Sequence, residues 1–307
     1  MRRRAAVTVA LMMSVVLGGC ELTDVTLIDF TDVVVAEVYV TVSDVANASR
    51  LRAFIHGTAA GSQPSTQSFD DALVTITDGD GVASVLPLSV PDECVSTRPE
   101  DSGGSCFAAD LVLAGSFTPG ESLGLDISLA DGRTLAGSTR IPGDFLVADV
   151  GSGCRVTPDT NLPLRWSRSD GAWTYLSEAY ITGLPAALAD EGIEAPDSLY
   201  LLGLSISESD TTVTFPSEIG IFDRFSLDQD LAVRLQRGLP EGASADVAIT
   251  AVDRNFVNWV RGGSFNPSGT VRVTSLTGDG SGVFGAAVTR RFTLVSSTDT
   301  TAGPPCS

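Results

Sequence analysis

The chain has 307 residues, with 38 Asp and Glu against 19 Lys and Arg, and a formal net charge of −19. At 43% hydrophobic residues it can form apolar cores, and its length predicts about two domains. The composition excludes collagen, coiled coil and bulk disorder. The acidic excess argues against a nucleic-acid partner, because DNA and RNA phosphates attract basic surfaces.

The N-terminal segment predicts an export signal. Arg2–Arg4 are cationic and precede an apolar run over Ala5–Leu17, which is shorter than the roughly 20 residues that a membrane-spanning helix needs. The next residues read Leu-Gly-Gly-Cys and resemble the lipobox of bacterial lipoproteins, whose cysteine receives a diacylglycerol on its sulfur and becomes the new N-terminus. An ordinary signal peptide with an incidental cysteine is the alternative.

Cleavage at this motif would set the bounds of the mature chain. We expect a lipoprotein signal peptide over residues 1–19, a lipidated Cys20 and a tether over 20–31. The lipid then makes the membrane the first partner. Glu21 follows the cysteine and, by the sorting rule of Gram-negative lipoproteins, favours the outer membrane, on its periplasmic or its external face.

The other four cysteines are an even number in a compartment that permits disulfides. Three pairings are open. Cys94 and Cys106 flank a polar loop that a disulfide would close, and Cys154 and Cys306 lie at the two ends of the second half of the chain. We predict these two pairings. Zinc is the alternative, but the sequence has no CxxC motif and a single histidine, His56.

Residues 32–143 predict an N-terminal β-sandwich of immunoglobulin-like or transthyretin-like type. Short runs of apolar residues alternate with polar ones, as in strands that bury one face. Asp78-Gly79-Asp80-Gly81 lies between two runs and predicts a hairpin. The expected strands are Val33–Val42, Arg50–Thr58, Ala72–Thr77, Ala83–Leu88, Phe107–Leu113, Leu123–Leu129 and Thr134–Thr139.

Residues 154–307 predict a C-terminal, fibronectin-like sandwich with two short helices, so the expected fold class is mainly β. Leu162–Trp166 and Ala172–Ile181 flank a Ser-Asp-Gly turn and predict a hairpin. Further strands are expected at Ser244–Val252, Thr270–Ser275 and Val283–Val295.

The two helices are predicted from period and capping. Leucines recur at every fourth position from Leu227 to Leu239, after a capping box over Ser226–Gln229. Asp253 predicts the N-cap of a second helix, which runs through Trp259 and stops at two glycines.

A hydrolase-like motif occurs at Gly120–Gly124, which reads GESLG and matches the GxSxG nucleophile elbow. An elbow joins a strand to a helix, whereas Pro119-Gly120 predicts a turn into a strand. A Ser-His-Asp mechanism would use Ser122 and His56, and His56 lies in a strand pattern. We expect no catalytic residue, and an envelope hydrolase is the alternative.

Two acidic turns, Asp78–Gly81 and Gly278–Gly280, offer carboxylates to calcium, but neither completes a calcium-binding loop. Tight turns that need positive φ account for both, so we predict no metal and no cofactor. Four aromatic residues cluster on the predicted hairpin over residues 162–181. We expect them in the core, with a carbohydrate-binding surface as the alternative; they are Trp166, Trp173, Tyr175 and Tyr180.

The segment Gly278–Gly285 holds four glycines in eight residues, a density that costs conformational entropy. One interpretation is a bulged turn whose Phe284 fills the sandwich core. The other is a partner-docking edge at Gly282, framed by Trp259 and Arg261.

Four segments together resemble a family of uncharacterised bacterial outer-membrane lipoproteins, classed as a domain of unknown function. They read VVVAEVYVTV, SLGLDISLADGRTLAGSTRIP, AVDRNFVNWVRGGSFNPSG and TSLTGDGSGVFGAAVTRRFTL. The resemblance implies a β-rich protein, sometimes encoded beside TonB-linked receptors, and defines no catalytic residue. We therefore predict a lipid-anchored, non-catalytic envelope protein for binding or assembly, accessory to nutrient uptake. Its candidate partners are an outer-membrane receptor or a polysaccharide.

Overall fold

The computed structural model describes residues 33–45, 48–58, 65–95, 102–110, 117–220, 229–262 and 273–306. The predicted signal peptide, Cys20 and the tether lie outside the described residues, as do Ser226 and Leu227 of the first predicted helix. In the part of the chain that is described, no helix has both the length and the apolar character that a membrane crossing requires.

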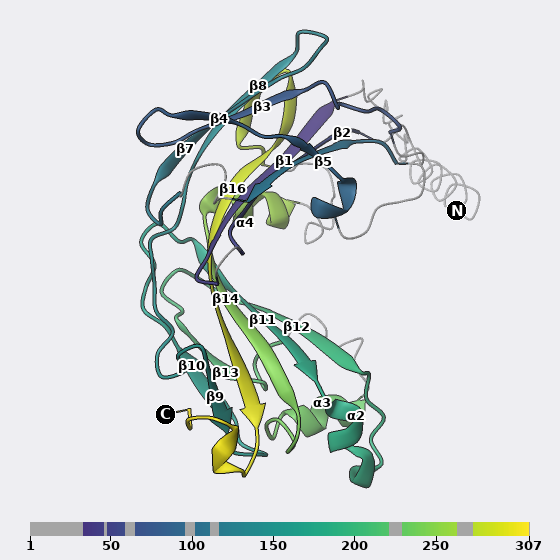
Figure 1. The fold of residues 1–307 in the computed structure, drawn as a ribbon, viewed down its shortest axis with the longest axis vertical. Helices are drawn as coiled ribbons and strands as arrows, with labels where there is room; N and C mark the ends of the chain where they lie inside the picture. The colour runs from purple at the N-terminus through teal and green to yellow at the C-terminus, as the bar shows by residue number, and fades with distance from the viewer. Residues whose placement is uncertain are drawn as a thin grey trace, which may run out of the picture. The chain divides into compact units, whose positions relative to one another are not determined.

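The protein is mainly β, with sandwich packing, which confirms the predicted fold class (Figure 1). The largest sheet within the described ranges has the order β12-β11-β14-β16-β1-β2-β6-β5, and β9 also pairs with β16. Its strands are β1 Val34–Ser43, β2 Arg50–Gly57, β5 Leu88–Ser89, β6 Ser105–Asp110, β9 Gly153–Val156, β11 Thr174–Thr182, β12 Ser198–Leu204, β14 Ser244–Val252 and β16 Gly280–Ser296.

Two smaller sheets cover one face of this sheet. One has the order β15-β8-β7-β3-β4, and the other is the pair β10-β13. Buried apolar residues from all three sheets form one continuous core cluster. The strands are β3 Leu73–Thr77, β4 Ala83–Val85, β7 Ser122–Ser128, β8 Thr134–Arg140, β10 Leu162–Arg165, β13 Thr212–Phe215 and β15 Leu276–Gly278.

Strand alternation produces these layers. In β2, Leu51, Ala53 and Ile55 are fully buried, whereas Arg52 between them is exposed. In β7 the buried residues are likewise every second one. Because successive strand side chains point to opposite faces, the period read from the sequence correctly predicts the buried face.

The strand β16 joins the two predicted domains, 32–143 and 154–307. Its residues 280–289 pair in parallel with β1, and its residues 287–295 pair in antiparallel with β14. Because these two ranges of β16 overlap, β1 and β14 pair with opposite edges of β16. Beyond the end of β1, β9 pairs with the same edge of β16, at Thr293–Ser296. The two halves therefore share a strand and a sheet, within one compact unit Asp32–Ser307.

Three predicted strand arrangements are wrong. The strand expected at Ala83–Leu88 is divided, because β4 ends at Val85 in one sheet and Leu88 begins β5 in another. The segments Leu162–Trp166 and Ala172–Ile181 do not form a hairpin, because β10 pairs with β13 while β11 pairs with β12 and β14. The intervening turn exists, with Gly171 at φ 75°, but it carries the chain from one sheet to the other. The predicted strand Thr270–Ser275 has no strand in its described residues, 273–275, and β15 begins at Leu276.

Short helices connect or cover the strands. In α3, Gln229–Leu235, the predicted core residues Leu231 and Leu235 are buried. The second predicted helix is α4, Arg254–Gly262, and its N-cap is Asp253 as predicted, because the carboxylate accepts a hydrogen bond from the Phe256 amide. The remaining helical turns are η1 Pro91–Glu93, α2 Leu184–Ala187, η2 Ala189–Glu191 and η3 Thr300–Ala302.

Both predicted disulfides are confirmed. Cys94 pairs with Cys106, and Cys154 pairs with Cys306. The second bond ties the C-terminal tail to β9, where the Cys306 amide also donates to Arg155 O at 3.0 Å. Cysteine count and loop position were sufficient to predict both.

Candidate ligand-binding cleft

The helix α4 lies on the face of the large sheet that is turned away from the sandwich core. Trp259 packs there with Val35 and Val283, while the core residues of β1 point the other way. Gly285 permits this close approach, because a Cβ at this position would lie 3.2 Å from the Cβ of Phe256. The outer face of β1 and β16 therefore carries a helix.

Hydrogen bonds hold α4 in this place. Trp259 Nε1 donates to Glu37 Oε1 at 3.1 Å, and Asn255 Nδ2 donates to Phe284 O at 2.9 Å. The ring of Phe256 meets that of Tyr39 edge to face, with centroids 5.3 Å apart. Both ends of the helix are thus fixed to strands far away in the sequence.

The buried Asp253 anchors the start of α4. Its Oδ1 accepts from the amides of Phe256 at 2.9 Å and Ala286 at 3.2 Å, and its Oδ2 accepts from Thr139 Oγ1 at 2.7 Å. Burial raises the pKa of Asp253, although these hydrogen bonds act to lower it. All its observed contacts are structural ones that join α4, β16 and β8.

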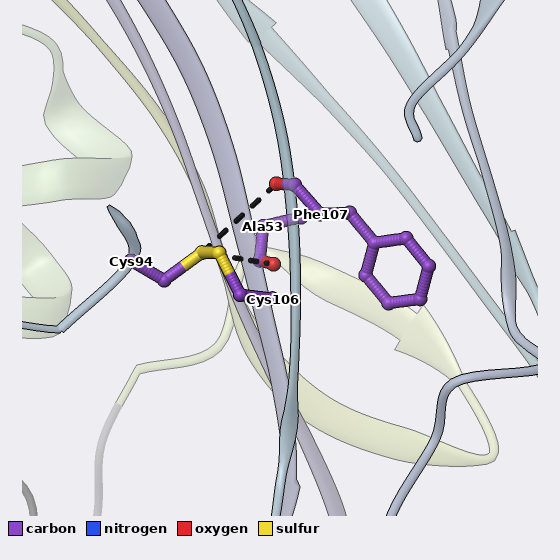
Figure 2. Close-up of a disulfide and its surroundings, with 4 residues drawn as sticks. All are labelled: Ala53, Cys94, Cys106 and Phe107. Atoms are coloured by element: carbon purple, nitrogen blue, oxygen red, sulfur yellow. Dashed lines mark hydrogen bonds between the residues drawn. A yellow bond between two sulfur atoms is a disulfide. The ribbon is translucent and has the colours of Figure 1, made fainter. Parts of the chain in front are cut away.

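The Cys94–Cys106 disulfide builds a second wall on the same outer face. Cys106 lies opposite Phe54 in the pairing of β6 with β2, and the bond holds Cys94 beside β2. Cys94 Sγ lies 3.5 Å from Ala53 O and 4.0 Å from Phe107 O, and Figure 2 shows both oxygens beside the disulfide. A disulfide sulfur carries no hydrogen, so these are contacts rather than donated bonds. Cys94 and Val95, which follow η1, thereby line the outer face of the sheet.

A cleft of about 370 Å³ opens over the sheet between these two walls. This volume lies in the range of small-molecule sites, which is roughly 300 to 1,000 Å³. Strands β1 and β2 supply the floor, α4 supplies Phe256, and β16 supplies Arg291. The lining residues are Glu37, Tyr39, Thr41, Ala48, Arg50, Arg52, Phe54, Cys94, Val95, Phe256 and Arg291.

The charge of the lining is opposite to that of the chain. Among the described residues, three arginines, Arg50, Arg52 and Arg291, line the cleft with one carboxylate, Glu37, whereas acidic residues outnumber basic ones two to one in the whole sequence. Sequence reasoning missed this cluster. The alternation of β2 signals that Arg50 and Arg52 share a face, but no local pattern brings Arg291 to them.

The residues of the predicted docking edge are divided between core and helix. Phe284 is fully buried in the main core. Trp259, which belongs to α4, is buried between this helix and the large sheet. Gly282 lies opposite Ala36 of β1, so the backbone that approaches its bare edge belongs to the same chain. Arg261 lies in α4, but its side chain is outside the described residues. This arrangement favours the bulged-turn interpretation.

The hydrolase-like motif lies in an extended segment. Ser122 is the first residue of β7 and pairs with Arg140 of β8, so the motif does not form the strand-to-helix elbow of a nucleophile. His56 lies in β2, where Nδ1 is 3.0 Å from Gly57 O and the ring stacks on Phe54.

The acidic turns have structural contacts. Asp78 Oδ1 accepts from the amides of Asp80 and Val82, and Asp279 Oδ2 accepts from Thr134 N. Within the described ranges, no group of three or more His, Cys, Asp or Glu side chains is placed to hold a metal ion.

The four aromatic residues of the predicted 162–181 hairpin divide into two pairs. Trp166 and Tyr175 are buried and pack edge to face, as expected for core residues. Trp173 and Tyr180 are instead exposed, by 43% and 46%. Arg254 lies over the ring of Trp173, 5.2 Å from its centroid. The core prediction is therefore correct for two residues and wrong for two.

Comparison with known proteins gives no family. No family model and no curated protein matches the sequence. Among solved structures, fibronectin(III)-like modules of CbhA from Clostridium thermocellum are similar at 11% identity, over 85% of this chain and 91% of that one. The TM-score is 0.20, which is too low to support a conclusion about fold or function.

Proposed function

We propose that the protein is a lipid-anchored, non-catalytic binding protein of the bacterial cell envelope, tethered through Cys20 to the outer membrane. The cleft on the outer face of the large sheet carries this proposal. Its walls are fixed by a helix cap and a disulfide, which is how a protein presents a preformed binding site.

The envelope location is supported by two independent features. The Leu-Gly-Gly-Cys motif follows a short apolar run, and two disulfides form within the described residues. Disulfides persist in oxidising compartments such as the bacterial periplasm and are rare in the cytosol.

Metabolic labelling with an alkyne fatty acid tests the anchor. The wild-type chain should take up label, and Cys20→Ala should not. The matched variant Glu21→Asp should keep the label but shift the protein from the outer to the inner membrane fraction. An unlabelled wild type, or label that persists in Cys20→Ala, would contradict the lipid anchor.

Affinity capture from detergent-solubilised outer membrane tests the binding role. The full-length protein should retain an outer-membrane receptor or a polysaccharide, and Phe256→Ala, which removes one wall of the cleft, should retain less. Ser122→Ala is the matched control, because it alters the GESLG motif but not the cleft. Equal capture by a blank column and by the wild type would contradict the binding role.

Carbohydrate binding outside the cleft is a second candidate, favoured by one observation. Tyr180 and Tyr200 lie directly opposite each other on β11 and β12 and are 46% and 45% exposed. Paired exposed aromatic rings can stack on sugars. If so, Tyr180→Ala with Tyr200→Ala should abolish retention on a glycan array, whereas Phe256→Ala should not.

A further inference from the structure

We infer that the cleft between α4 and Cys94 binds a small organic anion, which the guanidinium groups of Arg52 and Arg291 in its lining attract and hold. This inference rests on the proposed binding role and names the chemical class of the ligand.

Strand geometry places the polar groups of the cleft on one face. Tyr39 pairs with Arg52 and Thr41 pairs with Arg50 across β1 and β2, and directly opposed side chains share a face of a sheet. Thr289 of β16 pairs with Ser43 of β1, so Arg291, two residues further on, points to the same face. Arg50, Arg52 and Arg291 therefore lie on the same outer face along the cleft, with Arg52 level with Tyr39 and Arg291 further along β16.

Protein contacts already engage two of the charged groups. Arg50 Nη1 lies 3.0 Å from Asp110 Oδ1, and Glu37 accepts the Trp259 indole hydrogen. Arg52 and Arg291 are both exposed, and no acidic side chain in the described residues forms an ion pair with either. Asp44 does approach Arg291, but Oδ1 accepts from its backbone amide, at 3.2 Å.

Two guanidinium groups suit an anion because each offers a planar set of donors, which can bind a carboxylate or phosphate in bidentate fashion. The strongly acidic chain, with a net charge of −19, would repel anions elsewhere on its surface. The positive charge of the described lining is therefore confined to this cleft, and it favours an anionic ligand over a neutral or cationic one.

The rest of the lining indicates that the ligand is organic. Tyr39, Phe54 and Phe256 place aromatic rings beside the arginines, and a bare inorganic ion would leave these surfaces in contact with water. A ligand with a ring or a short carbon skeleton would cover them. The volume of about 370 Å³ admits a molecule of monosaccharide to disaccharide size.

Isothermal titration of the purified full-length protein in nonionic detergent, at constant ionic strength, tests the inference. The probes are glucuronate, inorganic phosphate and neutral glucose. Glucuronate should bind saturably, phosphate more weakly and glucose not at all. Binding of phosphate as tightly as glucuronate would also support anion recognition and would make the anionic group, rather than the ring, the main determinant.

Arg52→Gln and Arg291→Gln should each weaken glucuronate binding about tenfold or more, because each removes a charged hydrogen-bond partner. Arg52→Lys should recover part of the loss. Arg168→Gln is the matched control, since Arg168 is an exposed arginine paired with Glu208 and does not line the cleft. Circular dichroism checks that every variant is folded.

Absence of saturable binding for both anions, or equal binding by the wild type and the two glutamine variants, would overturn the inference. Failure of this titration can be distinguished from failure of the proposed function. Titration does not require lipidation, so a failed titration leaves the fatty-acid and capture results standing, and an unlabelled chain can still bind glucuronate.

Discussion

The two ends of the strand β16 are packed by different means. At its start, Gly280, Gly282 and Gly285 let the backbones of β1 and α4 come close; a Cβ on Gly280 would lie 2.6 Å from Val34 O. At its other end, Phe292 and Leu294 fill the core with side chains. The first end should therefore be sensitive to added atoms, and the second to lost atoms and lost covalent ties.

The largest effect is expected at the glycine end. In Gly282→Val the new Cβ would overlap the Ala36 carbonyl oxygen, at a φ of 147° that side chains rarely adopt. We expect a loss of more than about 5 kcal/mol in the free energy of unfolding, or no folded protein. Chemical denaturation and expression level measure this.

The control for that substitution is Gly124→Val in β7. A Cβ there meets Thr77 only at ordinary contact distances of 3.7 Å and more, and valine suits a strand. Its stability should stay within about 1 kcal/mol of wild type. Comparable losses in both variants would show that valine is generally unfavourable here, and that close backbone approach is not the cause.

The next effect concerns the covalent tie beside the other end of β16. Replacing Cys154 and Cys306 by Ala removes a bond that spans 152 positions, and the chain-entropy model gives a loss of about 5 kcal/mol. The same change at Cys94 and Cys106, 12 positions apart, should cost about 3 kcal/mol. Urea unfolding of the two double variants tests the order, and a larger loss for the short loop would contradict it.

A slightly smaller effect is expected from lost core volume. Phe292 is 4% exposed and belongs to the main core cluster, so Phe292→Ala should cost about 3 to 4 kcal/mol through the cavity it leaves. Thr293→Ala is the neighbouring control on the exposed face. If thermal unfolding showed equal losses for both, side-chain packing would not explain the stability of this end.

The smallest effect concerns the cap of α4. Asp253→Ala leaves the Phe256 and Ala286 amides without their acceptor and should cost about 2 kcal/mol. Asp253→Asn keeps an acceptor oxygen and should cost less. Urea unfolding of the two variants at neutral pH measures both costs, and an equal loss in the two would contradict the capping role.

The pH dependence of unfolding provides a separate test of Asp253. Burial raises its pKa above the ordinary 3.8, so the folded protein holds this proton more tightly than the unfolded chain. The part of its contribution that comes from binding this proton is therefore fully present below pH 3.8 and is lost as pH rises through the folded pKa. Asp253→Asn should remove this part of the slope; an unchanged profile would contradict the assignment.

Many strand positions and the helix cap were predictable because they depend on residues close together in the sequence. The alternation in Arg50–Gly57, the turn after Asp78 and the cap at Asp253 each act over a few residues. The disulfides followed from the number of cysteines and their positions in the sequence. Strand pairing was harder to predict from the sequence. The turn at Ser169–Gly171 predicted a hairpin, but the strands before and after it lie in different sheets.

The sequence by itself determined many of the strands, the buried face of alternating strands such as β2 and β7, the helix cap and the cysteine pairs, but not β9, β12 or β13. Only the tertiary structure decided that β1 pairs with β16, more than 200 residues away, and that Arg291 thereby joins Arg52 in one cleft. The physical reason lies in the backbone. Alternation specifies which side of a strand is buried, but its amide and carbonyl groups can pair with any neighbour, so partner choice depends on packing across the whole sheet.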